Sequence, residues 1–198
     1  MQNFVIRPAT PDDADSLLNI YSYYVESTTV SFEVVPPSVE EFRGRIENIS
    51  SRYPYLVGEY EGKIVGYTYA GVFKGRAAYD WAVETTIYLD RTCKGMGFGT
   101  ALYSELKNNL VAQGILNMNS CIAVPVEDKE DEYLTMDSMK FHEAFGFELA
   151  GRFHKCGSKF GRWYDMIWME MIIGEHVSDQ PKIRYFSDIK KELYPDYE

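Results

Sequence analysis

The sequence predicts an α/β fold of the α+β kind, in which about four helices flank a mixed, mostly antiparallel central sheet of about seven strands. Two strand-like segments, at 55–60 and 63–70, flank Glu61-Gly62, a turn dipeptide that is typical of an antiparallel hairpin. A strand over 79–89 is followed by a glycine-rich loop, a helix and a strand over 117–124, and such a crossover favours a parallel pair. A chain of 198 residues with 45% hydrophobic content also suits one compact domain.

Two helices are predicted ahead of the main strands. A short strand over 4–7 is followed by Pro11, which opens a helix that ends near Ser27. Ser38 is placed to cap a second helix, and Glu41, three residues further on, completes a capping-box pattern.

The strand over 79–89 alternates in character along its length. Apolar side chains such as Val83 occupy one face, whereas Glu84 and Thr86 lie on the more polar face. The helix after the glycine-rich loop carries leucines at four-residue spacing, and Gly114 is placed to end it.

The pattern in the last part of the chain predicts one more helix and two aromatic-rich strands. The helix is expected over 134–145, and the strands over 147–153 and 163–173. We therefore expect a folded domain over residues 1–173. The remaining residues, 174–198, are charged and tyrosine-rich, and we expect them to form a C-terminal extension that is an appendage to the domain.

Composition and charge exclude several classes of protein. The net charge of −10 argues against nucleic acid or an anionic membrane as a partner. The apolar runs are shorter than the roughly 18 residues that a membrane span needs, and the N-terminus lacks a signal-peptide pattern, so we expect a cytoplasmic protein. Three widely spaced cysteines without a Cys-x-x-Cys pair predict neither a disulfide framework nor a metal site.

The loop Lys94-Gly95-Met96-Gly97-Phe98-Gly99 is the strongest single indication of a ligand. Glycines at alternate positions let consecutive backbone N–H groups point into one concavity, and the N-terminus of the following helix adds partial positive charge. No acidic residue lies between Gly95 and Ser104, so this end of the helix is suited to a phosphate. An ordinary strand-to-helix turn is the alternative. A dinucleotide-binding fingerprint is disfavoured, because the G-x-G-x-x-G spacing is absent.

The order of elements resembles that of the GNAT superfamily of acetyl-coenzyme A (acetyl-CoA) dependent N-acetyltransferases. Within it, the chain resembles the phosphinothricin N-acetyltransferases and related small amino-acid acetyltransferases, in colinear order from Val5 to Met171. The motifs that carry this resemblance are Ile6-Arg7-Pro8-Ala9-Thr10, Thr29-Val30-Ser31-Phe32, Arg52-Tyr53-Pro54-Tyr55-Leu56-Val57, Tyr69-Ala70-Gly71, Ala78-Tyr79-Asp80-Trp81-Ala82-Val83-Glu84-Thr85-Thr86-Ile87-Tyr88, the glycine-rich loop, Phe141-His142-Glu143-Ala144-Phe145-Gly146-Phe147 and Gly161-Arg162-Trp163-Tyr164-Asp165.

The resemblance implies direct acetyl transfer to an amino group. An amine that attacks a thioester must be neutral, so a base has to take its proton, and the departing thiolate benefits from an acid. The resemblance assigns the base to Glu84 and makes His142 a candidate general acid. The alternative for Glu84 is a solvated strand carboxylate. The alternative for His142 is a structural histidine packed beside Phe141 and Phe145.

The resemblance also implies acetyl-CoA as the acetyl donor, coenzyme A as a product and no metal. A backbone N–H at Ile87 or Tyr88 is expected to meet the charge that develops on the thioester oxygen. The chain departs from the family pattern in having Lys94 at the start of the loop and Thr135 where asparagine is expected, so we expect coenzyme binding to be altered at that edge. The residues expected to bind the coenzyme are Ile87, Tyr88, Leu89, Lys94, Gly95, Gly97, Gly99 and Thr100.

We expect the acceptor to be a small amino acid or an analogue similar to phosphinothricin. Such substrates carry acidic groups, so a cation should face them, and Lys74 or Arg76 is placed for this. The residues expected to bind the acceptor are Phe32, Phe73, Lys74, Arg76, Tyr79, Thr86 and Trp163, although aromatic residues at such spacings more often belong to a core.

A cationic acceptor such as a polyamine or aminoglycoside would use the acidic loop at 127–132, and this loop is otherwise an ordinary solvated surface segment. A non-catalytic acyl-CoA-binding module is the alternative outside enzymes. The resemblance also implies a homodimer, because relatives of this kind commonly form one.

Overall fold

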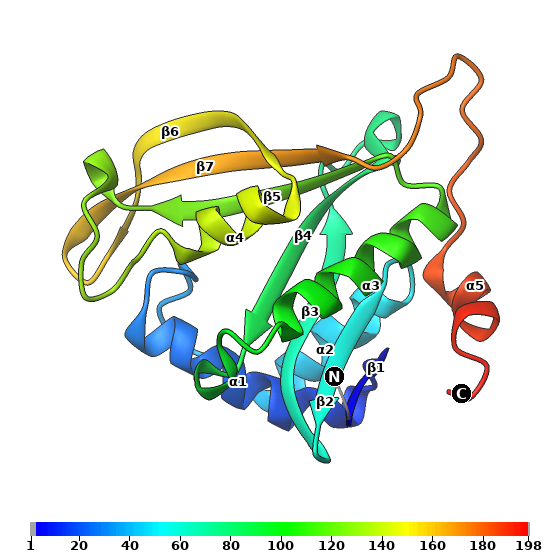
Figure 1. Cartoon of the computed structure of the whole chain (residues 1–198), viewed down its shortest axis with the longest axis horizontal. Coiled ribbons are helices and arrows are strands. Elements are labelled where there is room, and N and C mark those ends of the chain that lie inside the picture. The colour runs from blue at the N-terminus through cyan, green and yellow to red at the C-terminus, as the bar shows by residue number, and fades with distance from the viewer. Residues whose placement is uncertain (1–2, 198) are drawn as a thin grey trace. The chain divides into compact units, whose positions relative to one another are not determined.

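A computed structural model describes residues 3–197, and its seven strands form one sheet in the order β1-β2-β3-β4-β5-β7-β6 (Figure 1). The strands are β1 (Phe4–Pro8), β2 (Tyr55–Tyr60), β3 (Lys63–Val72), β4 (Ala82–Leu89), β5 (Asn117–Val124), β6 (Glu148–Lys159) and β7 (Arg162–Ile172). The helices are α1 (Ala14–Ser27), α2 (Val39–Ser50), α3 (Phe98–Gln113), α4 (Asp137–Phe145) and α5 (Phe186–Leu193). The pairs β1–β2, β2–β3, β3–β4 and β6–β7 are antiparallel. The mixed, mostly antiparallel sheet that the sequence predicts is confirmed.

The crossover through α3 brings the start of β5 beside the start of β4. The carbonyl oxygen of Trp81, the residue before β4, accepts hydrogen bonds from the backbone N–H groups of Leu116 at 2.8 Å and Asn117 at 3.1 Å. Two strands that begin at the same end of a sheet run in the same direction, as the strand–helix–strand pattern predicts.

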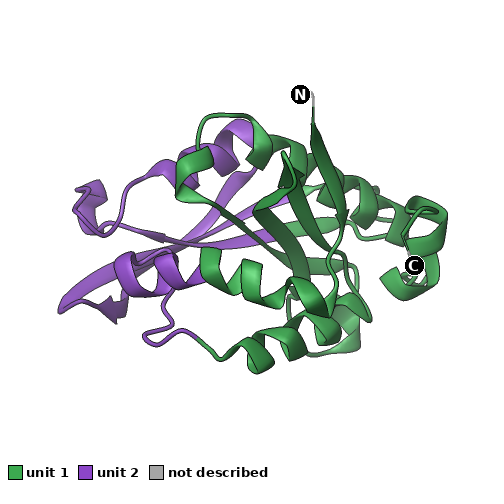
Figure 2. Cartoon of the chain, turned by 90° about the horizontal axis from the view of Figure 1, so that it is seen from below, with its two compact units in different colours: residues 1–20, 37–118, 172–198 green, residues 21–36, 119–171 purple. Residues whose placement is uncertain are grey.

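The chain divides into two compact units (Figure 2). Unit 1 contains the described residues up to Ile20, together with Pro37–Met118 and the described residues from Ile172 onward. Unit 2 contains Tyr21–Pro36 and Asn119–Met171.

The two faces of β3 and β4 in unit 1 are covered by different helices. The Thr85 hydroxyl is 2.8 Å from the hydroxyl of Tyr103 on α3, so α3 covers that face of β4. On the other face, Phe42 of α2 packs edge-to-face against Tyr67 of β3, with ring centroids 6.2 Å apart. Because neighbouring residues of a strand point to opposite faces, Glu84 lies on the face away from α3.

Two predicted boundaries at the start of elements are wrong, and local turns explain both. The strand expected from Tyr79 begins at Ala82, because residues 77–79 form a 3₁₀ turn in which the N–H of Tyr79 bonds to the carbonyl oxygen of Arg76 at 2.9 Å. The helix expected from Leu134 begins at Asp137, because the Asp131 carboxylate accepts hydrogen bonds from the N–H groups of Tyr133 and Leu134 and holds a turn there.

The C-terminal segment packs into unit 1 and is not the appendage that its composition predicts. Phe186, Ile189 and Tyr194 are buried, and the backbone N–H of Phe186 bonds to the carbonyl oxygen of Arg52 at 2.9 Å. Phe186 and Ile189 are three residues apart on α5, so they fall on one face of that helix, which is amphipathic. The many charged residues between these apolar positions explain why composition alone predicts exposure.

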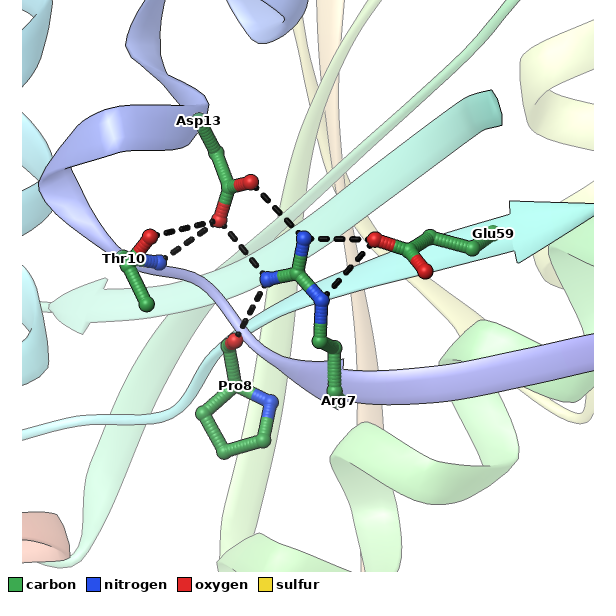
Figure 3. Close-up of polar contacts among 5 residues, drawn as sticks. All are labelled: Arg7, Pro8, Thr10, Asp13 and Glu59. Carbon is green, nitrogen blue, oxygen red and sulfur yellow. Dashed lines mark hydrogen bonds and ion pairs between the residues drawn. The ribbon is translucent and has the colours of Figure 1, made fainter. Parts of the chain in front are cut away.

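The Arg7 side chain joins β1 to the start of α1 and to β2 (Figure 3). Its guanidinium donates two hydrogen bonds to the Asp13 carboxylate, each 2.8 Å long, and one from Nε to Glu59 at 2.9 Å. The backbone N–H of Thr10 adds a bond to Asp13 at 2.7 Å. Burial by itself would raise the pKa of Asp13, but the bonds from Arg7 and Thr10 outweigh it and hold this pKa below its ordinary value.

The described residues contain no helix long and apolar enough to cross a membrane. Within residues 3–197, no group of three or more His, Cys, Asp and Glu side chains is arranged to hold a metal ion. The cysteines form no disulfide in this part of the chain.

Candidate functional site

The loop between β4 and α3 has backbone geometry that suits an anion. Gly95 and Gly97 have φ angles of 75° and 82°, a left-handed conformation that costs a residue with a side chain roughly 1–2 kcal/mol. Gly97 is the N-cap of α3, and the first turn of α3 contains no Asp or Glu. The first N–H groups of the helix therefore meet no capping side chain from Gly97 and no local negative charge, which leaves them suited to an anionic ligand.

Packing and hydrogen bonds anchor this loop at both ends. Phe98 is buried, and its ring stacks on that of Phe4 with centroids 4.4 Å apart. At the other end, the N–H of Asp90 bonds to the carbonyl oxygen of Val65, and the Asp90 carboxylate accepts bonds from the backbone N–H and the hydroxyl of Thr92 at 2.8 and 2.7 Å. The loop is thus preorganised, so little conformational entropy is lost when a ligand binds.

Glu84 is a half-buried carboxylate on the face of β4 away from α3. It lies opposite Gly71 of β3, a residue that adds no side chain beside it. Burial raises the pKa of Glu84, and the charge of Lys74 opposes part of that rise. A carboxylate whose pKa is raised in this way is a stronger base than an exposed one, which suits it to accept a proton.

The connection between β3 and β4 brings three of the predicted acceptor residues together. The Phe73 and Tyr79 rings pack edge-to-face with centroids 6.2 Å apart, and Lys74 Nζ lies 4.8 Å from the centroid of the Phe73 ring. Lys74 also lies close enough to Glu84 for its charge to affect the pKa of that carboxyl. Arg76 is exposed, and its N–H bonds to the carbonyl oxygen of Lys74 at 2.8 Å, which closes a tight turn.

In unit 2, His142 is buried on α4. Its ring packs edge-to-face against Phe141 and Phe147, with centroids 5.3 and 5.2 Å away, and Nδ1 is 2.7 Å from the carbonyl oxygen of Ser138. Burial lowers the pKa of this imidazole. The hydrogen-bond geometry assigns the hydrogen to Nδ1, so the neutral ring presents Nε2 as an acceptor.

The predicted acceptor residues Phe32 and Trp163 do not share a face of the β6–β7 hairpin. Phe32 packs edge-to-face against Tyr164, with ring centroids 6.4 Å apart, and lies against the backbone at Gly157, where an added Cβ would come within 2.5 Å of its ring. Because neighbouring residues of a strand point to opposite faces, Trp163 points away from Phe32, and it is 59% exposed.

Lys159 supports the Phe32 segment and is a residue that sequence reasoning missed. It is buried, and its Nζ donates to the carbonyl oxygens of Thr28 at 2.8 Å and Ser31 at 2.6 Å. Nothing in the sequence separates this lysine from a surface lysine at the end of a strand, because its two acceptors are backbone atoms far away in the chain.

Comparisons with known proteins identify the family to which the chain belongs. Residues 6–168 match the family model described as an acetyltransferase (GNAT) domain. Phosphinothricin N-acetyltransferase of Streptomyces viridochromogenes is 36% identical over 161 residues, which cover 81% of this chain and 83% of that protein. L-methionine sulfoximine/L-methionine sulfone acetyltransferase of Pseudomonas aeruginosa is 28% identical over 84% of this chain and 92% of that protein. A GNAT superfamily phosphinothricin acetyltransferase from Sinorhizobium meliloti, solved in complex with acetyl-CoA, has a TM-score of 0.82 and 34% identity over 94% of this chain and 97% of that one.

Proposed function

Because this chain belongs to the GNAT family of N-acetyltransferases, we propose that it acetylates the amino group of a small amino acid or analogue such as phosphinothricin or methionine sulfoximine. The observation that carries the proposal is the half-buried Glu84, whose pKa is raised by burial. Glu84 lies on β4, the strand that leads into the glycine-rich loop. One strand thus connects a base to a site suited to a phosphate.

The loop fits the diphosphate of acetyl-CoA, because two left-handed glycines precede a helix N-terminus that has no acidic residue in its first turn. When bound, acetyl-CoA supplies the activated acetyl group and leaves as coenzyme A. We assign the diphosphate to the backbone N–H groups of Gly95, Gly97, Gly99 and Thr100 with the charge of Lys94, and the pantetheine arm to Ile87, Tyr88 and Leu89.

Glu84 serves as the base in this proposal. An amino acid carries a protonated amine near neutral pH, and the amine becomes nucleophilic once the Glu84 carboxylate accepts a proton from it. The half-buried position keeps the carboxylate poorly solvated, which strengthens it as a proton acceptor. Lys74 has two roles in the proposal, because it limits the rise in the pKa of Glu84 and provides a cation for the acidic group of the acceptor.

A polyamine or aminoglycoside acceptor is less well supported, because the carboxylates of the acidic loop at 127–132 already have basic partners. Each of its carboxylates forms an ion pair within unit 2, so a cationic ligand would have to compete with side chains that are already bound there. The pairs are Glu127–Lys129, Asp128–Arg152, Glu130–Lys140, Asp131–Arg162 and Glu132–Arg162.

A panel of acceptors tests the proposed function. Purified protein would be mixed with acetyl-CoA and phosphinothricin, methionine sulfoximine, methionine sulfone, a polyamine or an aminoglycoside, and release of the free thiol would be followed. We expect turnover on the amino-acid analogues. Turnover confined to the polyamine or aminoglycoside would reject the acceptor class, and binding of acetyl-CoA without thiol release on any amine would identify a non-catalytic module. Light scattering on the same sample tests the proposed homodimer.

Gly97→Ala is expected to weaken binding of acetyl-CoA. The added Cβ disfavours the φ of 82° by roughly 1–2 kcal/mol, so the loop has to shift, and KM for acetyl-CoA should rise about tenfold. Gly44→Ala on α2 is the control, because that glycine has no atom within 4 Å of an added Cβ and lies within an ordinary helix. An unchanged KM in Gly97→Ala, measured by initial rates at saturating acceptor, would argue against the loop as the diphosphate site.

The acid role of His142 stays a prediction, and its environment limits that role. The ring can donate a proton from Nε2 only when both nitrogens are protonated, and burial lowers the pKa for that state. We therefore expect His142→Phe to lower kcat by less than about tenfold at mildly alkaline pH, whereas loss of a general acid costs about 10²–10⁴-fold. A fall within that larger range, with an unchanged circular dichroism spectrum, would establish His142 as the acid.

A further inference from the structure

The residue before the strand that carries Glu84 is held by the C-terminal segment. Trp81 Nε1 donates a hydrogen bond of 2.7 Å to the carbonyl oxygen of Pro181, 100 residues further along the chain. The carbonyl oxygen of Trp81 accepts the bonds from Leu116 and Asn117 described above. Trp81 is therefore fixed both by the start of β5 and by a segment that lies beyond the matched family model, which ends at residue 168.

A second connection runs through Arg52. Its guanidinium donates to the Asp80 carboxylate at 2.8 Å and lies 5.3 Å from the centroid of the Tyr185 ring. Its carbonyl oxygen accepts hydrogen bonds from the backbone N–H of Phe186 at 2.9 Å and from Gln113 Nε2 at 2.8 Å. Asp80 and Trp81, the two residues that precede β4, are thus both linked to the C-terminal segment.

The C-terminal segment is itself firmly docked on α3. Gln113 Nε2 donates to the carbonyl oxygen of Arg184 at 2.7 Å, and the backbone N–H of Arg184 donates to the carbonyl oxygen of Gln113 at 2.8 Å. The hydroxyl of Tyr194 donates to the Glu105 carboxylate at 2.7 Å and accepts from Asn109 Nδ2 at 2.9 Å. In Figure 1 the segment, coloured orange to red, passes the C-terminal end of α3 and ends in α5 beside that helix.

We propose that residues 174–197, here called the C-terminal strap, are a positioning element for catalysis that fixes the start of β4 and thereby the Glu84 carboxylate. The inference rests on the proposed role of Glu84, which follows Trp81 by three residues. Because a strand is rigid over three residues, a shift of Trp81 also shifts Glu84. Because the glycine-rich loop lies at the other end of β4, the strap acts on proton transfer and leaves diphosphate binding at that loop unchanged.

Two variants of the full chain test the proposal. Trp81→Phe keeps an aromatic ring but removes the N–H that Pro181 accepts. Phe186→Ala removes a side chain that is 1% exposed and loosens the docking of α5. Leu193→Ala is the matched control, because it removes an apolar side chain from the same helix at a position that is 37% exposed. Hydrogen exchange of 174–197 and of 80–89 reports whether the strap has been released.

We expect Phe186→Ala to speed exchange in both segments and to lower kcat about tenfold, since small misplacements of a reacting group cost up to about 10²-fold. We expect Trp81→Phe to lower kcat several-fold, KM for acetyl-CoA to stay unchanged in both variants, and Leu193→Ala to behave as the parent protein. A strap acting through Glu84 also predicts that Trp81→Phe causes no further loss in a Glu84→Gln background.

An unchanged kcat in Phe186→Ala despite faster exchange of the strap overturns the proposal. If that variant does not fold, an unchanged kcat in Trp81→Phe overturns it equally. The proposal is also overturned if Trp81→Phe lowers kcat by the same factor in the Glu84→Gln background as in the parent protein, because the strap would then act by another route. Failure of the proposed function is a different result, in which Glu84→Gln itself retains activity.

Discussion

Glu84→Gln is expected to lower kcat/KM for the amine acceptor by about 10²–10⁴-fold, equivalent to about 3–5 kcal/mol of transition-state stabilisation. The amide keeps the size of the side chain but cannot take a proton from the amine. The loss should shrink as pH rises, because a larger share of the amine is then already neutral. Steady-state rates over a pH series, with saturating acetyl-CoA, measure both effects.

The stability of the same variant distinguishes catalysis from folding. Burial raises the pKa of Glu84 in the folded state, so folding disfavours its charged form above that pKa. Removing the charge should therefore leave the Tm unchanged or raise it, although activity falls. This combination is typical of a residue that is retained for function at a cost in stability.

Glu170→Gln provides the control, because Glu170 is an exposed strand glutamate on β7. We expect it to change neither rate nor Tm. The pH–rate profile gives an independent test, since the base must be ionised and activity should rise with pH through a value above the ordinary pKa of glutamate. Equal loss of rate at every pH, or a lower Tm in Glu84→Gln than in Glu170→Gln, would count against Glu84 as the base.

Local periodicity in the sequence was enough to predict where Glu84 lies. Alternation along β4 places Thr85 against Tyr103 and therefore Glu84 on the opposite face, as the sequence predicts. The crossover after β4 is also confirmed, because the start of β5 bonds to Trp81. The alternate glycines of the loop are only partly alike, since Gly95 and Gly97 have positive φ whereas Gly99 lies within α3. Each of these predictions depends on residues that are close in the chain.

The features that sequence reasoning missed depend on contacts between distant residues. Lys159 bonds to Thr28 across 131 positions, and Trp81 bonds to Pro181 across 100. Their acceptors are carbonyl oxygens, which every residue has, so no side-chain pattern marks them. His142 is a different case, because its motif is visible in the sequence and its bond to Ser138 is local, whereas its burial depends on the packing around α4.

Arg7→Met is expected to lower the free energy of unfolding by about 3 kcal/mol at neutral pH, because it leaves a buried carboxylate without its charge partner. The side chains of Arg7 and Asp13 are only 16% and 10% exposed, so water cannot replace the two lost bonds fully. Methionine keeps much of the apolar stem of arginine, so most of the loss reports the polar contacts. Urea unfolding followed by fluorescence measures this difference.

The pH dependence of that loss identifies Asp13 as its cause. Arg7 helps to hold the pKa of Asp13 below its unfolded value, so its stabilisation is fully present above the ordinary carboxyl pKa of about 4 and is lost as pH falls through the lower folded value. The difference in the free energy of unfolding between Arg7→Met and the parent protein should therefore become smaller in acid. Arg45→Met is the control, because Arg45 pairs with Glu41 at an exposed i,i+4 position worth about 0.5 kcal/mol. If the loss of unfolding free energy in Arg7→Met is constant with pH, or no larger than that in Arg45→Met, the contacts of Arg7 in Figure 3 contribute through packing and not through charge.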